Sequence, residues 1–289
     1  MLLIGALWGL TLPLARVAVS TGHSALGLIV WEKVLSGTLL GVLVLAMRMR
    51  VSLSRDRVRM YFWVGVLGAT LPGYVGFVTA AHLPAGVRAI IVASVPLFVL
   101  PIALFLGFER PDARRAVGVA LGGLAVVLIA SATGQTPGAT LSVAMVFLAL
   151  LGPLSYAIEG NYIAARGNET PHPFVLLFGA AIASVAITAP LALVSGETVN
   201  LFVRWGPAEW ALAAGAALDV AAYSGYVWLV GAAGPVFASQ IAYAVTGFGV
   251  IWSMALLGER YPVLVWGALA AMLAGLALVQ PKSAGAKSA

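Results

Sequence analysis

The sequence predicts an all-α integral membrane protein with ten transmembrane helices, arranged as two inverted five-helix repeats. Three observations predict this fold: a scarcity of charged residues, a regular series of long apolar stretches, and an internal repeat. Only 9% of the 289 residues are charged and 62% are hydrophobic, whereas a soluble domain carries roughly 25% charged residues to face water. With a mean hydropathy of +1.03, most of the protein surface must face lipid.

Ten apolar stretches are each long enough for a transmembrane helix, which takes roughly 20 residues. They cover residues 2–20, 26–47, 60–81, 87–107, 114–131, 141–163, 173–194, 208–230, 235–257 and 262–280. The breaks between them are short and are polar or contain glycine or proline, so no separate soluble domain fits. The first stretch lacks the basic flank of a secretory signal and has a counterpart later in the chain, so we expect a structural span there.

An internal repeat relates the two halves of the chain. A shift of 150 residues places Phe105-Leu106-Gly107-Phe108-Glu109-Arg110 over Ala255-Leu256-Leu257-Gly258-Glu259-Arg260, and a shift of 143 places Ala6-Leu7-Trp8-Gly9 over Ala149-Leu150-Leu151-Gly152. Because each half has five spans, the second half enters the membrane upside down relative to the first. We therefore predict a first repeat over 1–131, a connecting loop over 132–140, a second repeat over 141–280 and a tail over 281–289.

Most basic residues are predicted on one side of the membrane. Eleven lie in loops or the tail on the side of the N-terminus: Arg48, Arg50, Arg55, Arg57, Arg59, Arg110, Arg114, Arg115, Arg166, Lys282 and Lys287. Three, namely Arg88, Arg204 and Arg260, fall on the other side. The positive-inside rule then places both termini in the cytoplasm of a multi-pass protein in a bacterial-type inner membrane. Because these residues occur in short bursts between apolar runs, the net charge of +6 indicates orientation rather than nucleic-acid binding.

Ionisable side chains inside spans are costly and are therefore candidates for function. Asp219 lies near the middle of the eighth span, with Tyr223 and Tyr226 one to two turns further on. A carboxylate at this depth would bind a substrate ammonium group or exchange a proton; the structural alternative is a hydrogen-bonded aspartate that joins helices.

Two further pairs are expected to be structural. Arg16 and Glu32 lie at similar predicted depth in the first and second spans, where an ion pair or snorkelling would satisfy them. Glu159 is expected near the cytoplasmic end of the sixth span, where Arg166 would neutralise it.

The Trp8-Gly9 opening and the doubled endings Leu106-Gly107-Phe108-Glu109-Arg110 and Leu257-Gly258-Glu259-Arg260 resemble the EamA family of the drug/metabolite transporter superfamily. The resemblance extends from Trp8 to about Val279. It departs at Phe108, which interrupts the Gly-Glu spacing, and at Leu151, which replaces the tryptophan in the second half. Among bacterial members, the chain is most similar to amino-acid exporters, including the aromatic branch. Glu109 and Glu259 carry the family motif and are expected to act in the fold or in a gate.

The resemblance implies that the third, fourth, eighth and ninth spans form the walls of a substrate cavity. On these spans we predict a substrate-binding set comprising Tyr74, Ser94, Asp219, Tyr223, Tyr243 and Thr246. A mostly apolar pocket with a few polar groups suits an amphipathic small molecule, although such residues also join helices in membranes. Pro13 and Pro153 lie in the helices that open the two halves and are predicted hinges, with static kinks as the alternative.

The predicted function is export of amino acids, aromatic ones among them, or of related metabolites by alternating access. Other metabolites or drugs are alternative substrates, and a passive channel or a receptor is a less favoured alternative. An enzyme is not expected, because the chain has no cysteine, its three histidines fall at span ends or in loops, and no metal-binding motif occurs. We therefore expect no catalytic residue, metal or cofactor, and a small molecule and membrane lipid as partners. The sequence specifies no oligomeric state.

Overall fold

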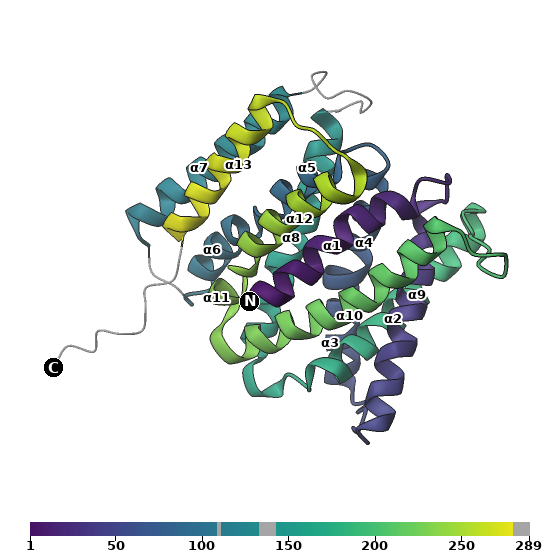
Figure 1. Ribbon diagram of the computed structural model, residues 1–289. Helices are drawn as coiled ribbons and strands as arrows, with labels where there is room; N and C mark the ends of the chain where they lie inside the picture. The colour runs from purple at the N-terminus through teal and green to yellow at the C-terminus, as the bar shows by residue number, and fades with distance from the viewer. Residues whose placement is uncertain (109–110, 133–142, 280–289) are drawn as a thin grey trace.

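The computed structural model describes residues 1–108, 111–132 and 143–279, and this part of the chain is helical with no strand (Figure 1). The first half contains α1 (Leu2–Ala18), α2 (Ala25–Ala46), α3 (Arg55–Val64), the π-helical segment η1 (Gly65–Thr70), α4 (Leu71–Ala80), α5 (Ala85–Val92), α6 (Val95–Phe105) and α7 (Ala113–Ser131). The second contains α8 (Val143–Arg166), the short 3-10 segment η2 (Gly167–Glu169), α9 (Pro173–Ser195), α10 (Pro207–Ala233), α11 (Pro235–Ala238), α12 (Ile241–Leu257) and α13 (Val263–Val279).

Within the described residues, eight helical segments are long and apolar enough to cross a membrane. Each has between 19 and 27 residues, counting α3–η1–α4, α5–α6, α8–η2 and α11–α12 as continuous spans. The helices α1 and α13 have 17 residues each, which corresponds to about 25 Å of helix, short of the roughly 30 Å of hydrocarbon in a bilayer. A multi-pass helical chain is therefore observed, whereas two of the ten expected spans are shorter than a standard crossing.

Several boundaries differ from those expected. The third span begins at Arg55 rather than at residue 60, and Asp56 lies in its first turn, where a negative charge stabilises the helix N-terminus. The fourth span is interrupted between Val92 and Val95, just before Pro96, because proline clashes with the preceding turn and has no amide hydrogen to donate. The expected connecting loop (apart from Ala132), the expected tail, Glu109 and Arg110 lie outside the described residues.

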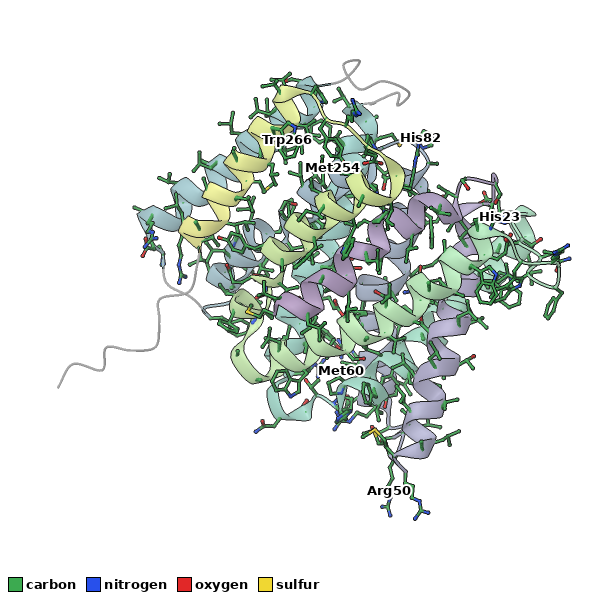
Figure 2. The ribbon with its side chains drawn as sticks, viewed as in Figure 1. His23, Arg50, Met60, His82, Met254 and Trp266 are labelled. Atoms are coloured by element: carbon green, nitrogen blue, oxygen red, sulfur yellow. The ribbon has the colours of Figure 1, made fainter. Side chains whose placement is uncertain are left out.

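The two ends of the helix bundle are distinguished by their loops. Arg50, in the α2–α3 loop, lies at the opposite end of the molecule from His23 and His82, which lie in the α1–α2 and α4–α5 loops (Figure 2). We call the end with Arg50 the inner end and the end with His23 and His82 the outer end. At the outer end the hydroxyl of Ser24 donates to the carbonyl of Glu197 across 2.8 Å, so loops of the two halves are joined there.

Small residues allow the helices to approach closely. The helix α1 packs between α10 and α12, and a Cβ atom on Gly9 would lie 2.8 Å from the amide nitrogen of Gly249. The helices α7 and α13 pack as a pair at one edge of the molecule (Figure 1), where a Cβ atom on Gly118 would lie 2.6 Å from the carbonyl oxygen of Gly275. Close packing of this kind replaces the hydrophobic driving force that is missing between helices in lipid.

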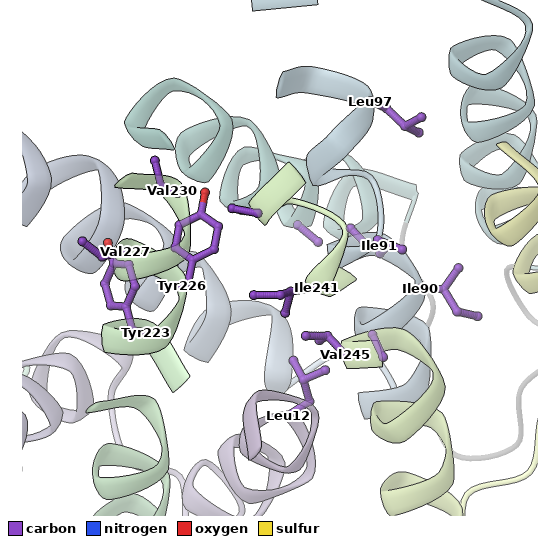
Figure 3. Packing of buried hydrophobic residues seen from close by; sticks show 14 of the residues in the cluster. Leu12, Ile90, Ile91, Leu97, Tyr223, Tyr226, Val227, Val230, Ile241 and Val245 are labelled. Atoms are coloured by element: carbon purple, nitrogen blue, oxygen red, sulfur yellow. The ribbon is translucent and has the colours of Figure 1, made fainter. Parts of the chain in front are cut away.

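The core lies where helices of both halves meet. Figure 3 shows Leu12 of α1, Ile91 of α5, and Ile241 and Val245 of α12 converging beside the tyrosines of α10. Elsewhere, α2 packs against α9 and α10, and α8 packs against α4 and α6. This central region, built from both halves, also surrounds the candidate site.

Candidate functional site

A cavity of about 160 Å³ lies between the two halves. Its walls come from α1, α2, η1–α4, α5–α6, α8, α10 and α11–α12, so the first, second and sixth spans contribute in addition to the four that were expected. Its polar and aromatic lining residues are Trp8, Thr11, Glu32, Lys33, Phe77, Thr79, Arg88, Tyr156, Asp219, Tyr226 and Ser239. The lining begins at Ala18 and Thr79, near the outer ends of α1 and α4, and reaches Tyr226 and Ser239 toward the inner end.

An ion-pair network lies in one wall of the cavity. The ammonium nitrogen of Lys33 lies 2.6 Å from Glu32 Oε1 and 3.3 Å from Asp219 Oδ2, and Lys33 is only 5% exposed. The predicted pairing of Arg16 with Glu32 is wrong. Arg16 instead donates to the backbone carbonyl of Ala80, because its side chain faces α4 while Glu32 is held by the adjacent lysine.

Arg88 adds a second buried cation to the lining. It lies inside α5, is 7% exposed, and its Nη1 donates one long hydrogen bond of 3.4 Å to the carbonyl of Leu12. Within the described part of the chain it forms no ion pair with a carboxylate. The assignment of Arg88 to a loop was therefore wrong: α5 begins at Ala85, one turn earlier, which brings the guanidinium to the cavity.

Four aromatic rings close the inner part of the cavity. Trp8 lies 5.7 Å from Tyr156, 5.9 Å from Tyr223 and 5.6 Å from Tyr226, measured between ring centroids. Trp8, Tyr156 and Tyr226 line the cavity, and Tyr223 packs behind them. Aromatic pairs at these separations attract one another beyond the effect of burial alone, so the cluster forms an aromatic floor.

Glu159 lies behind this floor and not near the end of α8, where it was predicted. It is 0% exposed, and its Oε1 accepts a hydrogen bond from the hydroxyl of Tyr223. Arg166 instead lies 3.7 Å from Glu169, so the predicted neutralisation of Glu159 by Arg166 is wrong. Glu159 and Arg166 are seven residues apart, which corresponds to about 10 Å along the axis of α8. Glu159 therefore lies well inside the span.

The structure brings only part of the predicted binding set to the cavity. Asp219 lines it, and Tyr223 belongs to the aromatic floor, where it packs against Trp8 behind the lining residues. Ser94 is buried and donates to the carbonyl of Ile91 at 2.7 Å. Thr246 is buried too, and donates to the carbonyl of Ala89 at 3.1 Å.

Of the remaining predicted residues, one lines the cavity and the others do not. Tyr74 is 36% exposed and, like Tyr243, is not among the lining residues. Of the two predicted hinges, Pro153 lines the cavity while Pro13 is buried within α1. Both α1 and α8 continue as helices through these prolines.

Sequence reasoning did not assign Arg88, Lys33, Trp8 and Tyr156 to the site. A signal existed for Arg88: it was counted with the loop charges although it falls at the start of the expected span 87–107, and a basic residue inside a span is itself unusual. Trp8 was noticed only as part of the repeat, and Tyr156 follows the predicted hinge Pro153 by one turn.

Comparison with known proteins shows that the first part of the chain is similar to a transporter family. Residues 1–131 match the model of the EamA-like transporter family. The resemblance to this family that was predicted from the sequence is therefore confirmed over residues 1–131, and the similarity to amino-acid exporters stays a prediction.

Curated relatives extend the match. The proteins described as "Uncharacterized inner membrane transporter YedA" in Escherichia coli K12, O6:H1 (CFT073) and O157:H7 are each 26% identical to this chain over 212 residues. The match covers 71% of this chain and 65% of each relative, which is less than two thirds of the relatives' length. A solved structure, described only as the crystal structure of a protein, superposes with a TM-score of 0.63 at 16% identity, covering 95% of this chain and 93% of the other. At this level of identity, the similarity shows that the two proteins share a fold.

Proposed function

We propose that this chain is an inner-membrane transporter that exports small zwitterionic molecules with an apolar part, amino acids among them, by alternating access. The observation that carries this proposal is a cavity lined by both a sparsely bonded arginine and a carboxylate, above an aromatic floor. The description of the YedA relatives as inner membrane transporters supports the assignment to transport and to that membrane.

The charges of the lining match those of a zwitterion. Arg88 has one long hydrogen bond and therefore offers its other donors to a carboxylate, which a guanidinium binds in bidentate fashion. Among the described residues Asp219 accepts one hydrogen bond, of 3.3 Å from Lys33, so it is the group to receive a substrate ammonium. Two cations and two carboxylates line the cavity, and this balance disfavours a ligand that carries net charge.

The apolar lining and the volume define the rest of the ligand. Trp8, Tyr156 and Tyr226 offer ring surfaces to an aliphatic or aromatic group. One water needs roughly 10–15 Å³ of cavity volume, so a cavity of about 160 Å³ has room for a ligand of the size of an amino acid.

Alternating access is supported by the way helix contacts repeat. The helix α1 packs against α10 and α12, and α8, the opening helix of the second half, packs against α4 and α6. Exchanging the two halves converts one set of contacts into the other, while α2–α9 and α7–α13 map onto themselves. We therefore propose that the halves are inverted repeats, which can exchange the side on which a central site is open, and that both termini are cytoplasmic.

The test is counterflow of labelled solutes into proteoliposomes. Zwitterionic amino acids should show saturable uptake driven by the same unlabelled solute, and Arg88→Gln should raise their KM at least tenfold. The amides of the same amino acids, which lack the carboxylate, should be poor substrates and insensitive to this change. Arg114→Gln, at an exposed position of α7, is the matched control and should leave KM unchanged.

The alternatives give different results in the same assay. Equal transport of acid and amide would refute carboxylate recognition by Arg88. Saturable counterflow of sugars or nucleotides alone would indicate an exporter of other metabolites, and flux without saturation or counterflow would indicate a channel.

A further inference from the structure

Glu159 is a buried acid whose environment the proposed substrate site does not explain. Its Oε1 accepts a hydrogen bond from the Tyr223 hydroxyl, and its Oε2 has no hydrogen bond within the described residues. No basic residue in the described part of the chain forms an ion pair with it. A carboxylate buried with one hydrogen bond and no cation is strongly disfavoured, whereas the neutral acid is tolerated.

The local backbone is shaped to admit this pair of side chains. Gly68, in the π-helical segment η1, lies so close that an added Cβ atom would be 2.4 Å from Glu159 Oε1 and 1.7 Å from the Tyr223 hydroxyl oxygen. The hydroxyl of Ser155 donates to the carbonyl of Leu67 at 2.6 Å and ties α8 to η1. Isolated π-helical segments are frequent at functional sites, and here the segment creates the space in which Glu159 meets Tyr223.

The ionisable groups that act on Glu159 are all acids. Tyr223, Tyr226 and Asp219 approach it from α10, and Tyr156 lies one turn earlier on α8. Within their described bounds, η1, α6 and α11 contain no ionisable residue. The remaining elements packed on α8 carry Tyr74 on α4, Arg88 on α5, Arg114 and Arg115 at the start of α7, and Glu169 on η2. Lys33 is held between Glu32 and Asp219.

We propose that Glu159 is a proton-binding site, and that the bound proton keeps α8 and α10 together at the inner end of the cavity through the Glu159–Tyr223 hydrogen bond. When the proton leaves for water at the inner end, the carboxylate is left unpaired near Asp219, and separation of the helices allows it to become hydrated. Rebinding a proton restores the neutral acid and the closed inner end. Proton binding does not depend on which solute is carried, whereas its use to drive export rests on the proposed function.

The first test measures opening at the inner end. The chain has no cysteine, so an Ile163→Cys variant provides a single reporter one turn beyond Glu159, at a position that is 1% exposed. Its maleimide labelling rate in nanodiscs is divided by that of a Ser54→Cys variant, which corrects for thiol ionisation at an exposed site.

The proposal expects the corrected rate to rise at least tenfold between acidic and alkaline pH. In the Ile163→Cys protein, a second substitution Glu159→Gln, which resembles the protonated acid, should keep the labelling rate low at every pH. Tyr223→Phe in the same protein should raise the rate at acidic pH. Asp219→Asn should shift the midpoint and retain the response. A response abolished by Asp219→Asn and untouched by Glu159→Gln would overturn the proposal.

The second test needs no cysteine and no transport. Infrared spectra of the purified protein at neutral pH should contain the carbonyl band of a protonated carboxylic acid, lost in Glu159→Gln and retained in Glu169→Gln, an exposed control. Absence of this band from the folded wild-type protein would also overturn the proposal. A protein with the band but without amino-acid counterflow would keep the proton site and refute the proposed substrate.

Discussion

Lys33 in α2 and Asp219 in α10 form an ion pair of 3.3 Å that joins the two halves of the protein inside the cavity wall. Glu32 lies closer to the same ammonium group, at 2.6 Å. Asp219 is therefore the more weakly held carboxylate of the two. A substrate ammonium that replaces Lys33 at Asp219 would leave the lysine paired with Glu32, so substrate binding leaves no buried charge without a partner.

Lys33→Met should strongly destabilise the protein, because it leaves two carboxylates in the cavity wall without their cation. Removing one partner of a buried pair costs about 3–5 kcal/mol. Arg166→Met is the control: its pair with Glu169 spans 3.7 Å at an exposed site, and such pairs contribute about 0–1 kcal/mol. Thermal unfolding in detergent should show a much larger fall in Tm for Lys33→Met, and equal falls would contradict a structural role for the network.

Gly68→Ala should disrupt the contact between α8 and α10, because the new methyl group overlaps the atoms of Glu159 and Tyr223. Overpacking of this kind costs about 1–3 kcal/mol. Gly123→Ala in α7 is the matched change, since a Cβ atom there meets nothing within 4 Å and alanine favours the helix by about 1 kcal/mol. Unfolding temperatures of the two variants should move in opposite directions; a stabilised Gly68→Ala protein would disprove the close approach.

Glu259 should act as a clamp at the outer end. Its carboxylate accepts hydrogen bonds from the amides of Ala85 at 2.8 Å and Gly86 at 3.1 Å, and from the Tyr261 hydroxyl at 2.5 Å. It thereby caps α5 from the α12–α13 loop, and Glu259→Ala should cost about 1–2 kcal/mol. Thermal unfolding should show a smaller loss for Tyr261→Phe, which leaves both amide bonds in place.

The same carboxylate should influence the titration of Tyr261. Burial, together with the hydrogen bond and negative charge of Glu259, raises the pKa of Tyr261. Glu259→Gln removes the charge, so the pKa of Tyr261 should fall toward its ordinary value. Ultraviolet absorbance of tyrosinate, measured as the difference between proteins with and without the added Tyr261→Phe change, checks this, and an unchanged titration would exclude the electrostatic contribution of Glu259.

Single cysteines at the two ends of the molecule should label from opposite sides of the membrane. Ser54→Cys lies in the α2–α3 loop at the inner end, and Asn200→Cys lies in the α9–α10 loop at the outer end. In intact cells an impermeant maleimide should react with Asn200→Cys alone, and Ser54→Cys should react only after lysis. Reaction of both in intact cells would refute an odd number of crossings between these two loops, and with it the cytoplasmic placement of the α2–α3 loop.

The sequence by itself determined the helical membrane class, the approximate position of each apolar segment and the family resemblance. These features follow from local properties: the length of an apolar run, the breaks at glycine and proline, and the motifs that end matched helices. Asp219 could be singled out for the same reason, because a lone carboxylate in an apolar stretch stands out without knowledge of its partners.

The tertiary structure decided which side chains meet. Several helices are apolar on all sides, so hydropathy alone does not specify how each is rotated about its axis or how deep each residue lies. Arg88 therefore seemed to be a loop charge until α5 was seen to begin at Ala85, and Glu159 seemed to lie beside Arg166 until its contact with Tyr223, 64 residues away, was seen. Helix rotation and depth are set by close approaches such as those at Gly9 and Gly68, and these depend on the surface of the neighbouring helix.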